Sequence, residues 1–304
     1  PLPWDHIDTG IDKGWLAEDL QRALAAAVVP DCSFDGCSSC GVCGPDLGHN
    51  VVVPPPDIPD QVPGKAPPSE RVCRLRFQFS KTGAMALLSH LDVVRMLERS
   101  LRRSGLPVSF TGGFHPLPRL QLALALPLGV AAHGEWMDLE FLEAVDPAEA
   151  LRIWQATLPD AFRLLSAREV AVSEPSLSQH LASARWQFHL SPADPLEAEA
   201  ASSFPASLRQ ACQALFDADT LIWRDTDKKG RPRERDCRPF LLSLDLGPTP
   251  SDPDAGAPMA VQLHAQIDSM GRSLKPSQIH HWIQEQLGMT LAMARVERTA
   301  LLLQ

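Results

Sequence analysis

The chain has 304 residues, of which 44% are hydrophobic and 21% are charged, and its formal net charge is −9. These values exclude an acidic or basic disordered protein and leave room for about two domains with hydrophobic cores. No apolar run approaches the roughly 18 residues that a transmembrane helix needs, so no such helix is predicted.

The start of the chain and its cysteines indicate its setting. The sequence begins with Pro1 in place of an initiator Met and carries no signal peptide. Four of its seven cysteines lie in one short stretch, which is typical of a metal site in a reducing compartment rather than of a secreted disulfide framework. We therefore expect a cytoplasmic protein and a piece of a longer chain that lacks an N-terminal part.

One helix and a linker are predicted before the main body of the chain. Leu16, Leu20, Leu24 and Val28 recur every four residues, which predicts an amphipathic helix that ends at Pro30. The stretch 51–70 contains seven prolines. Because proline-rich segments favour extended, poorly packing conformations, this stretch is predicted to be a linker.

Residues 71–175 are predicted to form a first unit of strands and helices. Apolar and polar residues alternate over 73–79 and again over 137–141, as in strands with one buried face. A helical stripe follows Ser89-x-x-Asp92, which resembles a capping box, and a second helix is expected from Asp146-Pro147. Short strands are predicted at 108–110 and 120–127, and a last strand at 161–172.

Residues 176–304 repeat this order. Strands are predicted at 186–190, 221–223, 240–246, 259–268 and 289–298, with helices around 208–215 and 275–288. The stretch 192–207 is predicted to be a loop. Both halves therefore follow the order β-α-β-β-β-α-β, which predicts an α+β fold of two tandem ferredoxin-like units. The predicted domains are 1–50, 51–70 (linker), 71–175 and 176–304.

The cysteine cluster is the strongest chemical signal. Cys32, Cys37, Cys40 and Cys43 have the spacing C-x4-C-x2-C-x2-C. Thiolates select iron–sulfur clusters or zinc, and four ligands in one short loop favour an iron–sulfur cluster. Zinc, and a redox role without metal, remain alternatives. Asp46 and His49 are close enough in sequence to replace one ligand.

The charge distribution predicts an anionic partner. Residues 71–120 contain nine basic side chains and two acidic ones, so this segment is near +7. A strand, a Lys/Gly turn and a capped helix follow one another here, an arrangement suited to binding phosphate. The following residues are predicted to bind substrate or RNA: Lys81, Ser89, His90, Asp92, Arg95 and Arg99. A solvated basic helix face is the alternative interpretation.

Two further segments carry residues suited to RNA. In the loop 112–119, Phe114 and His115 are placed to stack a base beside Arg119. If His90 lies near His115, the pair would allow acid–base cleavage of RNA. The run 227–235 is predicted to be the tip of a basic hairpin, which either enters a nucleic-acid groove or stays solvated.

Several short motifs resemble a known family. They are Phe79-Ser-Lys-Thr-Gly83, Ser89-His-Leu-Asp92, Glu98-Arg-x-Leu-Arg-Arg103, Gly113-Phe-His-Pro-x-Pro118 and Leu126-Pro-Leu-Gly129. This combination resembles the uncharacterised domain of the radical-SAM-linked protein family. Residues 2–8 and the cysteine loop resemble the end of a B12-binding-type radical SAM protein. The resemblance implies a fused protein, with SAM bound only in the missing N-terminal part and an auxiliary cluster or zinc in the loop.

Three hypotheses follow. The first is an accessory, non-catalytic region of a radical SAM enzyme that recognises RNA or a ribosome-associated target. The second is a ferredoxin-like endoribonuclease that uses His90 or His115. The third is a protein-interaction module with a structural metal loop. The sequence identifies no catalytic residue.

Overall fold

The structure, a computed structural model, describes residues 3–43, 65–227, 229–247 and 258–304. The chain forms two compact units, Pro1–Pro63 and Gly64–Gln304. Residues 51–64 of the predicted linker lie outside the described residues, as do Asp46 and His49. Residues 65–70 of it are described, and Ala66 and Ser69 are hydrogen-bonded to the backbone of Gly113 and Phe110. None of the described helices is long and apolar enough to cross a membrane.

The N-terminal unit contains the helix α1 (Lys13–Leu24). Asp12 caps its start, because the Asp12 side chain accepts a hydrogen bond from the Trp15 amide at 2.8 Å. The predicted extension to Pro30 is wrong: the backbone turns at Ala26, whose φ is 54°. The apolar stripe is exposed, with Leu24 73% accessible.

In its described residues, the C-terminal unit contains an eight-stranded sheet, four α-helices and a separate two-stranded hairpin. The first half comprises β1 (Cys73–Lys81), α2 (His90–Ser104), β2 (Leu120–Leu122), β3 (Ala131–Phe141), α3 (Pro147–Gln155) and β4 (Phe162–Val170). The second half comprises β5 (Leu181–Pro192), α4 (Ala198–Asp217), β6 (Ile222–Thr226), β7 (Pro232–Asp236), β8 (Leu241–Leu246), β9 (Met259–Gln266), α5 (Pro276–Leu287) and β10 (Leu291–Leu303). The short 3-10 helices are η1 (Gly83–Leu87), η2 (Leu177–His180) and η3 (Arg238–Phe240).

The strand order confirms the duplicated ferredoxin-like fold. The sheet runs β4-β1-β3-β10-β5-β9-β8, and β2 pairs with β3. When the four sheet strands of each half are numbered along the chain, their order across the sheet is fourth, first, third, second, as in a β-α-β-β-α-β unit. The additional strand differs between the halves. In the first, residues 108–110 form isolated bridges only, and in the second the hairpin β6–β7 is inserted after α4.

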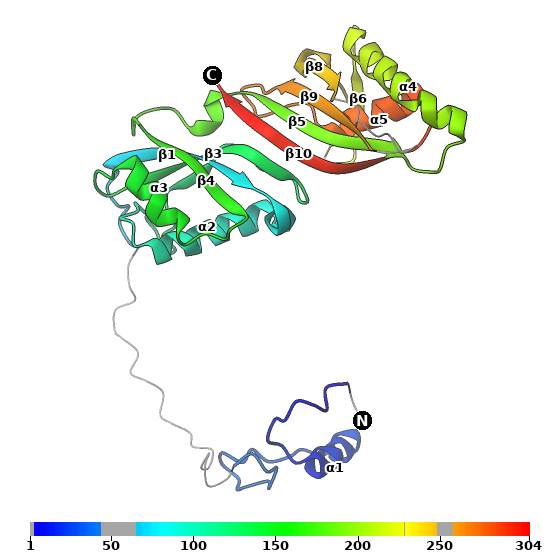
Figure 1. Ribbon diagram of the computed structural model, residues 1–304. Helices are drawn as coiled ribbons and strands as arrows, with labels where there is room; N and C mark the ends of the chain where they lie inside the picture. The colour runs from blue at the N-terminus through cyan, green and yellow to red at the C-terminus, as the bar shows by residue number, and fades with distance from the viewer. Residues whose placement is uncertain (1–2, 44–64, 228, 248–257) are drawn as a thin grey trace. The chain divides into compact units, whose positions relative to one another are not determined.

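The two halves join where β3 runs parallel to β10, through the pairs Ala131–Glu297 and Ala132–Arg298. Figure 1 shows the long strands β5 and β10 side by side in the middle of the unit. Each half packs two helices on one face of its sheet, and the two buried clusters lie on that face. In the first cluster, the Phe77 ring packs edge-on against Trp154 at 5.1 Å.

The helix α4 corrects the prediction of a loop at 192–207. It begins at Ala198 and contains Pro205 in its interior. Proline is costly in a helix because it lacks an amide N–H. Phe204, Leu208 and Cys212 are buried on the sheet side of α4, so packing against the sheet outweighs that local cost.

Candidate substrate interface and cysteine loop

The cysteine loop is attached to α1 by two hydrogen bonds. The Trp15 indole N–H donates to the Ser38 carbonyl at 2.8 Å, and the Asp12 amide donates to the Cys40 carbonyl at 2.7 Å. Gly36 and Gly41 have φ values of 95° and 94°, which let the backbone reverse direction tightly. The cysteine segment is therefore a folded loop held against the start of α1.

The four clustered thiols are free and lie in exposed or half-exposed positions. Within the residues that the structure describes, no three Cys, His, Asp or Glu side chains come together as a metal site requires. The donor set nevertheless fits a thiophilic metal. In addition, the Ser39 amide donates to the Cys37 sulfur at 3.3 Å, a contact of the kind that tunes metal-bound thiolates.

Several basic residues of the segment 71–120 are buried, contrary to the expectation of a wholly basic surface. Arg74 and Arg76 on β1 both bind the carboxylate of Asp138 on β3. Arg74 also donates to the carbonyls of Glu174 and Pro175, so the segment after β4 covers this face. These two arginines are 4% and 2% exposed and therefore cannot reach a ligand.

Lys81 is also buried, at 2% exposure, so its predicted ligand-binding role does not fit its position. Its ammonium group donates to the carbonyls of Ala86 and Leu88 at 3.4 and 3.2 Å, which ties β1 to η1. Burial lowers the pKa of Lys81, while the nearby carboxylate of Glu135 acts in the opposite direction. Lys81 is a structural residue of the junction between the halves.

The start of α2 is capped as predicted. The Ser89 side chain accepts from the Asp92 amide at 3.3 Å and donates to the Asp92 carboxylate at 2.6 Å. This hydrogen bond and the Arg95 charge lower the pKa of Asp92. His90 is half-buried at the start of the helix and lines a small cavity with Lys81.

Exposed positive charge follows one side of α2. Arg95, Arg99 and Arg102 lie three or four residues apart, so they follow one another along one side of the helix, and all three are exposed. Arg95 is 3.5 Å from Asp92. Within the described residues, Arg99 and Arg102 have no ion-pair partner. We call these three residues the arginine ridge.

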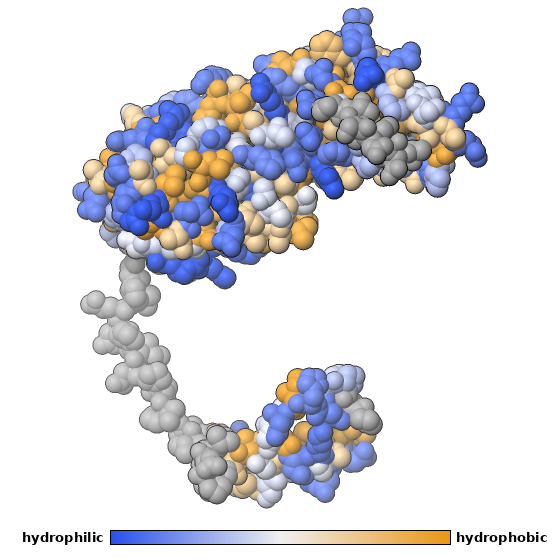
Figure 2. Space-filling model, in the orientation of Figure 1, coloured by the Kyte–Doolittle hydropathy of each residue, from blue (hydrophilic) through white to orange (hydrophobic). Residues whose placement is uncertain are grey.

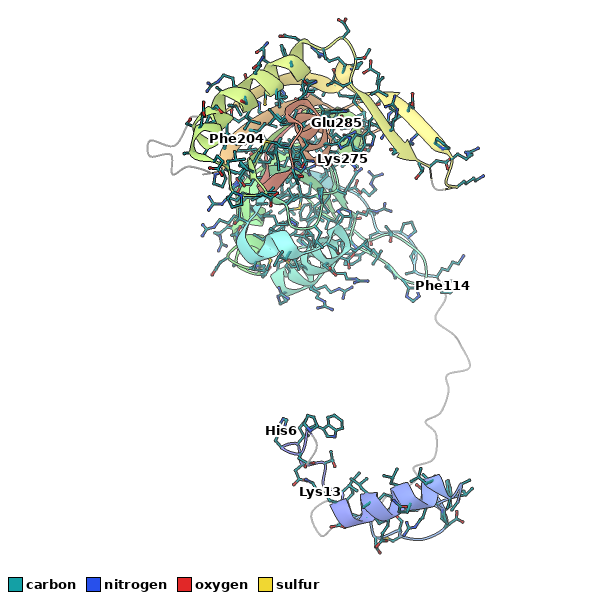
Figure 3. The ribbon with its side chains drawn as sticks, turned by 90° about the vertical axis from the view of Figure 1, so that its right-hand side faces the viewer. His6, Lys13, Phe114, Phe204, Lys275 and Glu285 are labelled. Carbon is teal, nitrogen blue, oxygen red and sulfur yellow. The ribbon has the colours of Figure 1, made fainter. Side chains whose placement is uncertain are left out.

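The loop 112–119 presents two of the predicted residues to solvent. Figure 3 shows Phe114 on a loop that projects from the body of the unit. Phe114 is 66% exposed, His115 is exposed, and the Lys65 ammonium lies 5.4 Å from the Phe114 ring centre. Arg119 is half-buried, 3.9 Å from the Glu140 carboxylate. In the described residues, no contact joins His115 to His90.

The basic hairpin is present, but cross-strand acids offset much of its charge. Arg224 pairs with Glu234 at 2.7 Å, and Arg233 pairs with Asp225 at 2.8 Å. At the tip, Arg231 pairs with Asp227 at 2.7 Å. The hairpin is therefore expected to attract phosphates less strongly than the six basic residues of 222–236 would by themselves.

Sequence reasoning missed the junction between the halves. Arg298 on β10 and Glu135 on β3 form a buried ion pair there. A mostly apolar cavity of about 560 Å³ lies beside it, lined among others by Leu126, Trp186 and Lys275. The Arg298 guanidinium donates hydrogen bonds to Glu135 and to two carbonyl groups, so little of its hydrogen-bonding capacity is left for a ligand in this cavity. No local sequence motif predicts this junction, because its residues come from strands that are far apart in the sequence.

Together these features define a duplicated ferredoxin-like protein with an exposed arginine ridge and a separate cysteine loop. Residues 74–276 match the family DUF2344, described as an uncharacterized protein conserved in bacteria. The match covers more than half of the chain, so the chain belongs to this family. No curated protein matches it.

Solved structures resemble the chain weakly. A crystal structure of a Cbf5–Nop10–Gar1 complex matches at 14% identity and a TM-score of 0.40, covering 74% of this chain and 49% of that chain. An H/ACA RNP bound to a substrate RNA containing 2'-deoxyuridine matches at 12% identity and a TM-score of 0.35, covering 73% and 47%. The chain thus spans about half the length of these relatives. Similarity this low carries no argument about function.

Proposed function

We propose that this chain is a cytoplasmic accessory region of a radical SAM enzyme that recognises RNA or a ribosome-associated target. In this proposal the C-terminal unit binds the anionic substrate. The cysteine loop holds an auxiliary iron–sulfur cluster, with zinc as the alternative. The radical SAM link rests on the motif resemblance described above. SAM itself would bind in a part of the protein that precedes this sequence.

The arginine ridge is the observation that carries the RNA proposal. Arg74, Arg76 and Lys81 are buried, so they add nothing to an interface. The ridge is exposed, and two of its three guanidinium groups lack an ion-pair partner within the described residues. An α-helix presents such a row at about 5–6 Å spacing, close to the spacing of phosphates along an RNA strand.

The two histidines of the alternative proposal are not brought together. His90 is half-buried beside Lys81, and His115 is exposed on the projecting loop. Acid–base cleavage requires both groups within reach of one phosphodiester. No observation favours an endoribonuclease over a binding region.

The ridge can be tested by salt-dependent RNA binding. The affinity of the full chain for a fluorescent single-stranded RNA of mixed sequence would be measured at several salt concentrations. Replacing Arg95, Arg99 and Arg102 by Ala removes three phosphate contacts. Each contact with a single strand contributes about 0.7 to the slope of log affinity against log salt, so we expect the slope to fall by about 2.

A matched control separates the ridge from total charge. Arg152 on α3, Arg209 on α4 and Arg272 in the turn between β9 and α5 are exposed. Their replacement by Ala removes the same net charge and should leave the salt slope within error of the wild type. Equal effects of the two triple variants, or no RNA binding by the wild type, would contradict the proposal.

The radical SAM link needs its own test. The longest polypeptide that carries this sequence would be purified anaerobically from its source cells and supplied with SAM and a reductant. We expect reductive cleavage of SAM. A longest polypeptide that does not cleave SAM would remove the link but leave the RNA proposal standing.

A further inference from the structure

The two halves of the C-terminal unit differ on the sheet face opposite their helices. In the first half this face is covered, because Arg74, Arg76 and Asp138 bind one another beneath the segment of Glu174 and Pro175. In the second half the equivalent face is open within the described residues. We call it the second-half open face, formed by β10, β5, β9 and β8.

The strand registers place polar side chains in two rows across this face. Asp245, Gln262, Gln187 and Glu297 are consecutive partners from β8 to β10, and Ser243, His264 and Arg185 form the neighbouring row. Directly paired residues point to the same side of a sheet, so both rows share one face. Buried partners such as Leu244 and Leu263 occupy the other face, toward α4 and α5.

A shallow depression of about 430 Å³ lies over these rows. Its polar lining consists of Arg185, Gln187, Ser243, Asp245, Gln262, His264 and Thr299. This volume is within the range of small-ligand sites. Within the described residues, the side chains of Arg185, Gln187, Asp245 and Gln262 have no hydrogen-bond or ion-pair partner. The depression therefore offers unsatisfied donors and acceptors to a ligand.

The geometry points to a specific occupant: we infer that the second-half open face reads the edge of a nucleobase in single-stranded RNA. This inference rests on the proposed function and names its base-reading surface. Neither row contains Phe or Trp, and the imidazole of His264 is half-buried and hydrogen-bonded to Ser183 at 2.9 Å, so the face is not a stacking platform. It recognises its ligand by hydrogen bonds instead.

The two glutamines are the centre of the recognition. Gln187 and Gln262 are directly opposite each other on β5 and β9. Each amide offers a donor beside an acceptor, which complements the paired acceptor and donor on a base edge. Arg185 in the neighbouring row adds donors, and Asp245 adds an acceptor for exocyclic amino groups. The arginine ridge supplies affinity, and this face supplies base preference.

The experiment compares base preference with salt dependence. Affinities of the full chain for the 12-nucleotide homopolymers of A, C and U would be measured by fluorescence anisotropy at one salt concentration. For the wild type we expect the affinities for the three homopolymers to span at least a fivefold range, which we call the spread. The variant Gln187→Ala/Gln262→Ala should reduce the spread below twofold and leave the salt slope unchanged.

The controls make the outcome decisive. Gln210→Ala/Gln213→Ala changes two exposed amides on α4, on the other side of the sheet, and should keep the full spread. If the double alanine variant does not fold, Gln262→Glu keeps the shape of the side chain while removing its donors and should still alter the spread. RNA binding with no base preference, or with an unchanged preference in these variants, would overturn this inference alone. Absence of RNA binding by the wild type would instead overturn the proposed function.

Discussion

Arg298 and Glu135 form a two-point ion pair that joins the two halves of the sheet, with N–O distances of 2.6 and 2.5 Å. The two residues lie 163 positions apart in the sequence and are 1% and 2% exposed. The Arg298 guanidinium also lies 5.2 Å from the ring centre of Trp186. Because the backbone pairing of β3 with β10 is short, this side-chain contact helps to fix which residues meet at the junction.

Glu135→Gln should destabilise the C-terminal unit strongly. The substitution leaves the Arg298 charge buried beside a neutral partner, which costs about 3–5 kcal/mol. Glu135→Leu/Arg298→Met removes both charges and should cost less than Glu135→Gln alone. Urea denaturation followed by circular dichroism would measure these free energies of unfolding. Arg152→Ala, which breaks an exposed pair with Glu149, should leave the free energy of unfolding nearly unchanged, because solvent screens such a pair. A double variant with a lower free energy of unfolding than Glu135→Gln would contradict this account.

The strands and helices were predictable because their apolar periodicity is local. The alternation in β1, β3 and β9 and the stripes of α2 and α5 follow from the residues themselves. The burial of Arg74 and Arg76 was not predictable, since alternation places them on a face that looks open. The segment that covers them, at Glu174 and Pro175, lies about 100 residues further along the chain.

The candidate sites divide in the same way. The Ser89 cap and the exposure of the arginine ridge follow from spacing along one helix. The junction ion pair and the rows of the second-half open face depend on which strands are neighbours. The periodicity of a strand gives the polar face of Gln187 or Gln262, but only the sheet order places the two amides opposite each other.

Gly112→Ala should loosen the attachment of residues 65–68. A Cβ at position 112 would lie 2.9 Å from the Pro68 nitrogen and 3.0 Å from the Ala66 carbonyl oxygen, both backbone atoms. That contact would push apart the paired backbones of Ala66 and Gly113, now joined by hydrogen bonds of 2.9 and 3.1 Å. We expect amide exchange at Ala66 to accelerate at least tenfold. Gly230→Ala, at a turn with open space, should leave that amide unaffected.

His264 should make stability depend on pH. Burial, and secondarily the positive charge of Arg185, lower its pKa below the ordinary value of about 6.5. Below pH 6.5 the unfolded chain then binds more protons at this residue than the folded chain, so stability decreases as the pH falls toward the folded pKa. Glutamine at this position keeps a partner for Ser183, now 2.9 Å from the imidazole, without titrating.

The measurement is the free energy of unfolding of the wild type and of His264→Gln between pH 8 and pH 5. The wild type should lose stability relative to the variant as the pH falls below about 6.5, and the difference should be constant above about 7.5. A difference that does not change with pH would show that the protein does not suppress protonation of His264.

Metal analysis of the anaerobically purified chain tests the cysteine loop. We expect about four irons with matching sulfide and visible absorbance if the loop holds a cluster, or one zinc without visible absorbance if it holds the alternative metal. Cys37→Ala/Cys40→Ala should lose the metal in either case. Cys212→Ala should retain it, because that thiol is buried in α4, where burial raises its pKa to about 12 and disfavours the thiolate that metals require. Metal-free wild-type protein, or metal retained by the double variant, would contradict a role for this loop as a ligand set.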